Sequence, residues 1–191
     1  MPGKQAKILT DHQIEDLLFY AAQSRHPIRN QLIVCLSVKA GLRAAEIAKL
    51  RWDMVRDADG QIGTVIELRD GIAKKRGGRL IPMHPCVRDL LETWQGLTDD
   101  FGAIIKSERG FGMAPGSIVL WFARAYEAIG LSGCSSHSGR RTFITRAARL
   151  VHDAGGSLRD VQMLAGHRSI VTTQRYTDGD TDAQRRLVSM L

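Results

Sequence analysis

The sequence predicts a mainly α-helical domain with one small antiparallel β-sheet, which is an α+β fold. Apolar residues recur at helical spacing up to about residue 50 and again from residue 84 onward. Between them, residues 63–83 contain two short segments of strand-like composition around an Asp-Gly turn. Hydrophobic residues make up 43% of the 191-residue chain and charged residues 25%, as in globular proteins. No internal repeat or linker-like segment is apparent, so we expect a single domain over residues 1–191.

Helices are predicted throughout the N-terminal part. The first, over residues 10–24, begins at the capping pair Thr10-Asp11 and places apolar residues such as Ile14 and Leu17 on one face. Residues 28–40 are apolar on nearly every side, which is typical of a buried helix. Gly41 ends this helix, and residues 44–50 favour a short one through their Ala, Glu and Lys content.

Two strands and then further helices follow. Residues 63–68 and 79–83 are the predicted strands, and the basic segment AKKRGG between them is expected to form a hairpin. The later helices are predicted over residues 87–94, 115–130, 140–153, 158–165 and 172–176. In the helix over residues 115–130 we expect Leu120, Phe122 and Ile129 to face the core.

The chain carries an excess of positive charge. Lys and Arg number 27 against 20 Asp and Glu, and the net charge of +7 favours a nucleic acid over a membrane surface or an acidic protein as partner. A merely basic soluble protein is the alternative. The apolar runs are shorter than the roughly 18–20 residues that span a bilayer, and MPGKQAK at the N-terminus lacks the apolar segment of a secretion signal. Cys35, Cys86 and Cys134 are scattered without metal-binding spacing, which indicates reduced thiols in a cytoplasmic protein.

Residues suited to phosphate chemistry occur in several separated segments. The segments are GLRAAEIAKLRW, the basic hairpin, HSGRRTF and LAGHRSIVTTQRYT. In chain order they contribute Arg43 and Glu46, then Lys74, Lys75, Arg76 and Arg79, then His137, Arg140 and Arg141, then His167 and Tyr176. Arginine binds phosphate oxygens bidentately, lysine and histidine exchange protons, and a tyrosine hydroxyl is a nucleophile that can stay attached to phosphorus. Each segment alone is a weak signal, because such residues are more often structural.

The order and spacing of all these segments resemble those of the tyrosine recombinases, the phage integrases and their relatives. An arginine segment is followed by a lysine hairpin that ends in RLIP, then by HxxR, by LAGH, and by a tyrosine nine residues after that histidine. The resemblance extends over about residues 9–177 and leaves residues 178–191 as a C-terminal tail. It implies the tyrosine recombinase catalytic-domain fold and a site-specific DNA recombinase that cleaves and rejoins strands through a 3′-phosphotyrosyl intermediate.

The resemblance implies a role for each matching residue. Tyr176 matches the nucleophile, and Arg43 and Arg140 match the arginines that bind the scissile phosphate and offset charge in the transition state. His137 matches a histidine suited to proton exchange, and His167 matches one that donates a hydrogen bond to a phosphate oxygen. These residues form the implied catalytic set, together with a lysine.

The supporting residues are assigned in the same way. Glu46 matches the acidic position that orients Arg43 and supports His137. Counting back from RLIP selects Lys74 as the general acid for the departing 5′-oxygen, with Lys75 as the alternative. Candidates for DNA contact are Lys75, Arg76, Arg79 and Arg141. A solvated or ion-paired surface position is the alternative for Arg141, and neither a metal nor a cofactor is expected.

The chain departs from the family pattern at both ends. Most members carry a separate N-terminal DNA-binding domain, whereas here about nine residues precede the first predicted helix. We therefore expect either a naturally short recombinase, similar to the fimbrial-switch inverting enzymes, or a piece of a longer integrase. The tail ends in Leu187, Val188, Met190 and Leu191, which either pack on their own domain or are donated to a neighbouring protomer.

The expected partners follow from the same resemblance. They are double-stranded DNA at a specific site, further copies of the chain in a tetramer on that DNA, and accessory DNA-bending proteins. The expected location is the cytoplasm, with a bacterial or phage gene and association with the nucleoid. Two alternative functions remain open, which are a recombination-accessory module without turnover and an enzyme similar to the type IB topoisomerases.

Overall fold

The computed structural model describes residues 6–72, 78–176, 185 and 188–190. The helices of these residues are α1 (Asp11–Ala22), α2 (Pro27–Val38), α3 (Ala44–Lys49), α4 (Pro85–Gln95), α5 (Pro115–Ala128), α6 (Ser138–Leu150), α7 (Leu158–Ala165) and α8 (Ile170–Gln174), with a 3-10 helix η1 (Trp52–Met54). Strands β1 (Val65–Leu68) and β2 (Arg79–Pro82) pair antiparallel. The predicted α+β fold is confirmed, and the predicted helices and strands are present with ends shifted by a few residues.

The first two helices form for reasons that are visible in the sequence. Thr10 accepts a hydrogen bond from the backbone of Gln13, and the Gln13 side chain accepts one from the backbone of Thr10, so a capping box begins α1. Helix α2 begins with Pro27, whose missing N–H costs nothing at a helix start. It is buried almost all round, as predicted, because α1, α4 and α6 all pack against it.

The two-stranded sheet sets the position of one arginine. The register pairs Leu68 with Arg79, so Arg79 is the first residue of β2 and follows directly after the hairpin segment. Helix α7 packs against β2. The side chain of Arg79 is therefore placed between the sheet and α7.

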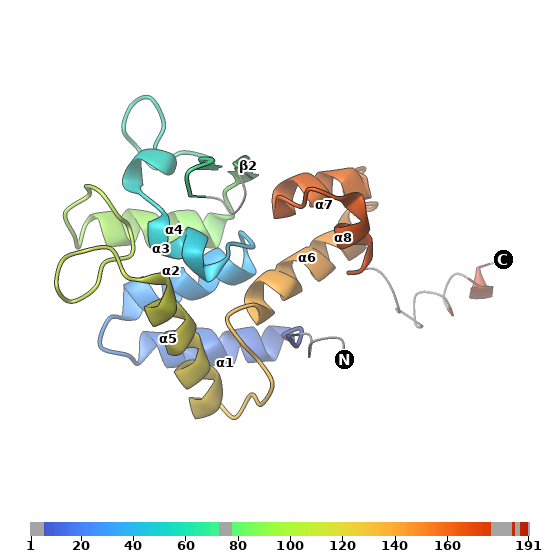
Figure 1. Cartoon of the computed structure of the whole chain (residues 1–191), viewed down its shortest axis with the longest axis horizontal. Coiled ribbons are helices and arrows are strands. Elements are labelled where there is room, and N and C mark those ends of the chain that lie inside the picture. The colour runs from blue at the N-terminus through green and yellow to red at the C-terminus, as the bar shows by residue number, and fades with distance from the viewer. Residues whose placement is uncertain (1–5, 73–77, 177–184, 186–187, 191) are drawn as a thin grey trace.

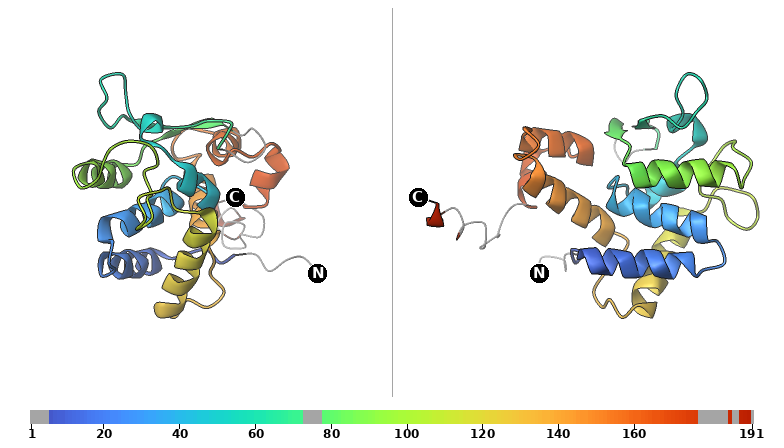
Figure 2. Two further views of the ribbon diagram at one scale, coloured as in Figure 1. Left: turned by 60° about the vertical axis from the view of Figure 1, so that its left-hand side comes forward. Right: turned by 180° about the vertical axis from the view of Figure 1, so that it is seen from behind.

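Buried apolar residues form two separate clusters. The first core is contributed by α1 to α5 and the sheet, and includes Trp52, Phe122 and Tyr126 among its largest side chains. The second core is small and joins α6, the turn after it and α7 through Ile144, Ala148, Val151, Val161 and Ala165. Helix α6 runs from the body formed by α1–α5 to the pair α7 and α8 (Figure 1). The view from behind also shows α7 and α8 set apart from that body (Figure 2).

One predicted core position is wrong. Leu120 was expected to face inward, but 51% of it is exposed. Helix α5 instead buries Ile118, Phe122, Ala125 and Tyr126, which are spaced by four, three and one residues. Leu120 lies two residues after Ile118, about 200° further round the helix, and therefore on the opposite face.

Candidate active site

Residues from several distant segments line one cavity of about 520 Å³ at the junction of the two cores. Its lining residues are Ala6, Arg43, Ser135, His137, Arg140, Arg141, His167, Thr172, Arg175 and Tyr176. The cavity thus brings together the predicted arginines, histidines and tyrosine. Lys74, Lys75 and Arg76 lie outside the described residues, so their places in the site stay predictions.

Arg43 is held at the entrance to α3. It is the residue before the helix, and its backbone N–H donates to Glu46 Oε2 at 2.9 Å. Its guanidinium Nη1 donates to Glu46 Oε1 at 2.8 Å, while 26% of the side chain stays exposed. One carboxylate therefore caps the helix and fixes the arginine in the wall of the cavity.

Glu46 is fully buried and is shared by two arginines. Besides its bonds to Arg43, its two oxygens accept from Nη1 and Nη2 of Arg79, each at 3.1 Å. Burial on its own raises the pKa of this carboxyl, but the hydrogen bonds and charges of Arg79 and Arg43 outweigh burial and hold the pKa at about 2. Glu46 is therefore ionised throughout the neutral range.

Arg140 is positioned by close helix packing and by two backbone carbonyls. Gly139, the residue before it, packs so tightly on Ser37 of α2 that a Cβ there would lie 2.3 Å from Ser37 Oγ. Arg140 Nη1 donates to the carbonyl of Gly41 at 2.6 Å and Nη2 to that of Ala165 at 2.5 Å. Burial, then the charge of Arg43, lowers the pKa of Arg140 to about 9, so the guanidinium stays charged at neutral pH.

His167 and Tyr176 come from the turn after α7 and the end of α8. Gly166, in the left-handed region at φ 62°, ends α7 and turns the chain into His167. His167 Nδ1 lies 3.0 Å from the hydroxyl of buried Thr173, and the His167 ring stacks on Tyr176 with centroids 5.7 Å apart. Burial, followed by the charges of nearby arginines, lowers the pKa of His167 to about 4. The imidazole is therefore neutral at pH 7, and when Thr173 donates to Nδ1, its Nε2–H is a hydrogen-bond donor.

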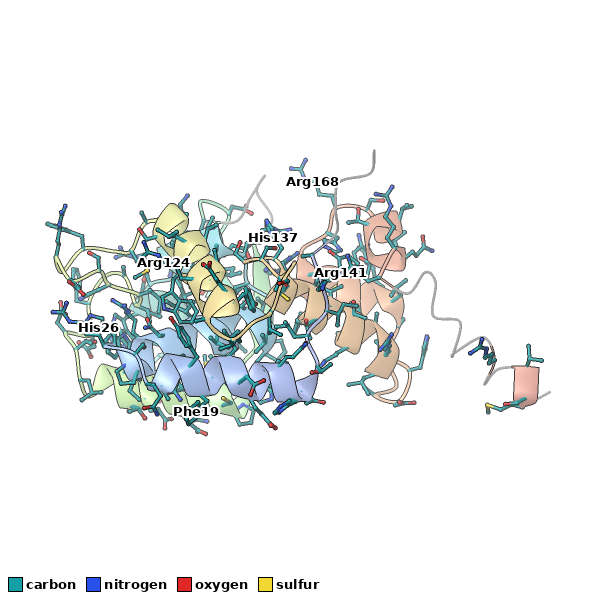
Figure 3. All side chains as sticks on the ribbon, turned by 90° about the horizontal axis from the view of Figure 1, so that it is seen from below. Phe19, His26, Arg124, His137, Arg141 and Arg168 are labelled. Carbon is teal, nitrogen blue, oxygen red and sulfur yellow. The ribbon has the colours of Figure 1, made fainter. Side chains whose placement is uncertain are left out.

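His137 and Arg141 complete the wall at the start of α6. His137 is the exposed residue that precedes the helix, and both side chains lie at this end of α6 (Figure 3). Arg141 is half-buried, and its Nε is buried without a hydrogen-bond partner among the described residues. Arg141 also lines the cavity, so it adds a second cation beside Arg140 at this end of α6.

The structure gives one predicted residue, Arg79, a partner within the protein, and it adds Thr173 and Arg175, which were not predicted. Arg79 was expected to contact DNA, but its side chain is only 6% exposed and is bound to Glu46; the DNA contact itself remains a prediction. Thr173 supports His167, and Arg175 adds a cation to the cavity wall. Both lie within TTQRYT beside Tyr176, so closeness to the predicted nucleophile was a signal for them.

Comparison with known proteins identifies the family. The model of the phage integrase family matches residues 7–182, which is nearly the whole chain. The chain belongs to the phage integrase family. The fold is that of a tyrosine recombinase catalytic domain, as the resemblance implied.

A curated relative supports this assignment, and two solved structures share the fold. The tyrosine recombinase XerC of Corynebacterium glutamicum is 30% identical over 177 residues, which cover 90% of this chain and 54% of XerC. The crystal structure of XerA recombinase superposes with a TM-score of 0.76 at 24% identity, covering all of this chain and 65% of XerA. XerH recombinase, solved bound to palindromic difH substrate in a post-cleavage complex, gives 0.75 at 20% identity and covers 99% of this chain and 54% of XerH.

The match to these recombinases is partial in length. This chain spans about half the length of the curated relatives that it matches.

The described residues contain no helix long and apolar enough to cross a membrane. In the same part of the chain, no three His, Cys, Asp or Glu side chains are grouped to hold a metal ion.

Proposed function

We propose that this chain is the catalytic domain of a site-specific recombinase that cleaves and rejoins DNA strands through a 3′-phosphotyrosyl intermediate. The observation that carries the proposal is the cavity, which gathers Arg43, His137, Arg140, His167 and Tyr176 from distant segments of the chain. Arginines surround a tyrosine there, as a reaction at an anionic phosphodiester requires. The cavity also contains a neutral imidazole that can donate a hydrogen bond.

In the proposed cleavage step, the Tyr176 oxygen attacks the scissile phosphorus. The new P–O bond forms as the bond to the 5′-oxygen breaks, so the strand is cut while its phosphate stays attached to the protein. His137, exposed at the cavity edge, takes the phenolic proton. The departing 5′-oxygen takes a proton from Lys74, or from Lys75 as the alternative. Rejoining is the reverse attack by a 5′-hydroxyl on the phosphotyrosine.

The arginines bind the phosphate in this proposal. Arg140 uses one N–H of each terminal nitrogen on a backbone carbonyl, and each of those nitrogens carries a second N–H. Arg43 is held by Glu46 on one side and lines the cavity on the other. Donors fixed before the substrate arrives stabilise developing charge without reorganising, which is the largest contribution in many enzymes. Arg141, which also lines the cavity, binds the DNA backbone beside the scissile phosphate.

The partners are proposed by analogy with the whole relatives. The substrate is double-stranded DNA at a specific site, as XerH was solved with its difH substrate. A tetramer on the DNA, accessory DNA-bending proteins, and a location with the nucleoid in the bacterial cytoplasm belong to the same proposal. Because the proposed contacts are with phosphate, the affinity of this chain for DNA should fall steeply with salt.

Covalent trapping on DNA tests the proposal. Nicked duplexes tiled across the DNA that flanks the gene release a short fragment after cleavage, so the protein–DNA adduct accumulates. The wild-type chain should form an adduct at low salt, and Tyr176→Phe should form none. Tyr20→Phe, on α1 away from the cavity, is the matched control and should retain the adduct.

Two outcomes would contradict parts of the proposal. If Tyr176→Phe still becomes attached to DNA, another residue is the nucleophile. If the wild-type chain is trapped by none of the duplexes but binds one of them, the accessory-module function gains support.

A further inference from the structure

We propose that Arg79 is a positioning residue that holds the lobe carrying His167 and Tyr176 against the lobe carrying Arg43. The lobe that carries Arg43 consists of the elements around the first core. The lobe that carries His167 and Tyr176 consists of the elements around the second core. The expected effect on DNA cleavage rests on the proposed function. The link between the two lobes rests on the hydrogen bonds of Arg79 alone.

All three nitrogens of the Arg79 guanidinium donate within the protein. Nη1 and Nη2 each donate to one oxygen of Glu46 at 3.1 Å, and Nε donates to the carbonyl of Leu164 at 2.8 Å. Glu46 belongs to α3 on the first core, whereas Leu164 lies in the last turn of α7 on the second. One planar, rigid group therefore connects the two lobes.

The connection is made at the C-terminal end of α7. The last carbonyls of a helix have no partner within it and carry partial negative charge, so cations are favourable there. Arg79 binds the carbonyl of Leu164, and Arg140 binds that of Ala165. A Cβ on Gly166, the next residue, would lie 3.0 Å from Arg79 Nη1, so the arginine packs directly against the turn that leads to His167.

The burial of the Arg79 side chain favours a positioning role over a direct contact with DNA. The Arg79 side chain is 6% exposed and Glu46 is fully buried, so a phosphate could reach this guanidinium only by displacing its protein partners. Arg43, bound to the same carboxylate, is 26% exposed and lines the cavity. Glu46 thus joins one arginine that faces the cavity to another that faces α7.

Removing Arg79 has two physical consequences. The lobe that carries His167 and Tyr176 loses one of its ties to the first core, which displaces the nucleophile relative to Arg43. Glu46 keeps Arg43 but loses its strongest partner, so burial raises the pKa of its carboxyl. A displacement of about 1 Å costs on the order of 100-fold in rate when reacting groups must be aligned.

The test compares Arg79→Met and Arg79→Lys with a matched control. Arg69→Met is the control, because it removes an arginine whose ion pairs with Asp53 and Glu67 are exposed at the surface. Hydrogen exchange of the free protein should rise in residues 158–176 of Arg79→Met, and stay unchanged in α1 and α4. Arg69→Met should exchange as the wild type does in residues 158–176.

Cleavage and binding of DNA should separate in the same variants. Arg79→Met should form the covalent adduct on the order of 100-fold more slowly, with unchanged affinity and salt dependence of DNA binding. Adduct formation by Arg79→Met should also fail at a higher pH than in the wild type, as Glu46 takes up a proton. Arg79→Lys should restore the wild-type pH profile, because it keeps the charge, but only part of the rate, because it lacks the planar fork.

Several results would overturn the proposal. Unchanged hydrogen exchange in residues 158–176 would do so whether or not the wild type cleaves DNA, so this outcome is independent of the proposed function. Faster exchange with an unaltered cleavage rate would reduce Arg79 to a structural residue. A fall of about one in the salt-dependence slope of DNA binding would make it a phosphate contact. If Arg79→Met does not fold, Arg79→Lys carries the same comparisons.

Discussion

Gly41 lies between α2 and α3, where the backbone must turn and also support the active site. Its φ is +65°, in the region that side chains other than glycine rarely adopt. Its carbonyl accepts the hydrogen bond from Arg140 Nη1. A Cβ at this position would lie 2.4 Å from Cδ1 and 2.9 Å from Cε1 of Phe143 on α6. Gly41→Ala therefore forces α6, the backbone turn or both to move.

The expected cost can be worked from these contacts. The left-handed conformation costs an alanine about 1–2 kcal/mol. Overpacking against Phe143 adds about 1–3 kcal/mol, so the free energy of unfolding should fall by about 2–5 kcal/mol. Gly60→Ala is the matched control, since Gly60 has φ +78° and nothing within 4 Å of its Cβ position. Gly60→Ala should cost only the backbone contribution of about 1–2 kcal/mol.

Urea unfolding and adduct formation measure the two effects separately. Gly41→Ala should be less stable than Gly60→Ala, and it alone should slow adduct formation, because the carbonyl that holds Arg140 is displaced. In a Phe143→Ala background, Gly41→Ala should lower the free energy of unfolding by less than in the wild type, because the ring with which the added Cβ clashes is absent. The reasoning is refuted if Gly41→Ala and Gly60→Ala lower stability equally, or if Phe143→Ala brings no relief.

Three further predictions concern the charged and polar groups around the cavity. Glu46→Gln leaves the buried Arg79 guanidinium without its anion, so it should lower the free energy of unfolding by about 3–5 kcal/mol in urea titrations. The control is Glu127→Gln on the exposed face of α5, which should change the free energy of unfolding little. The folded-state pKa of His167, about 4, lies below its ordinary 6.5, so the unfolded chain binds more protons between these values and stability should rise with pH across this window. That rise should be smaller in His167→Gln, and an identical pH profile would contradict the assignment. Thr173→Val removes the hydroxyl beside His167 Nδ1 and should slow adduct formation while DNA affinity stays unchanged; a parallel loss of affinity would argue for a contact with DNA.

Much of the fold could be predicted because local signals and the fold agree. The capping residue Thr10 and the apolar spacing after it define α1, and the all-round apolar segment becomes the central helix α2. Leu120 shows the limit of this reasoning. An apolar residue in a helix was assigned to the core, but which face of α5 is buried depends on α1 and α3, which pack against it from far away in the sequence.

The site could be predicted as a set of residues but not as a network. Motif spacing identified residues that the structure then placed around one cavity, including Arg43 and Tyr176. The partner of Arg79 could not be found in this way, because Glu46 is 33 residues away in sequence and the interaction depends on how β2 lies beside α3. The burial of Arg79 could not be predicted either. A basic residue next to a lysine hairpin has the same sequence pattern whether it faces DNA or the protein interior.

The arrangement of Arg140 and Arg79 has a consequence for the order of events at the site. Each guanidinium is bonded to both lobes, Arg140 through the carbonyls of Gly41 and Ala165, and Arg79 through Glu46 and Leu164. Such bonds orient the N–H groups of Arg140 before DNA is present, so little reorganisation remains for the transition state. The same bonds make the geometry depend on the contact between lobes. Loosening that contact should therefore slow cleavage more than it weakens binding, because phosphate contacts tolerate displacements that an in-line attack by Tyr176 does not.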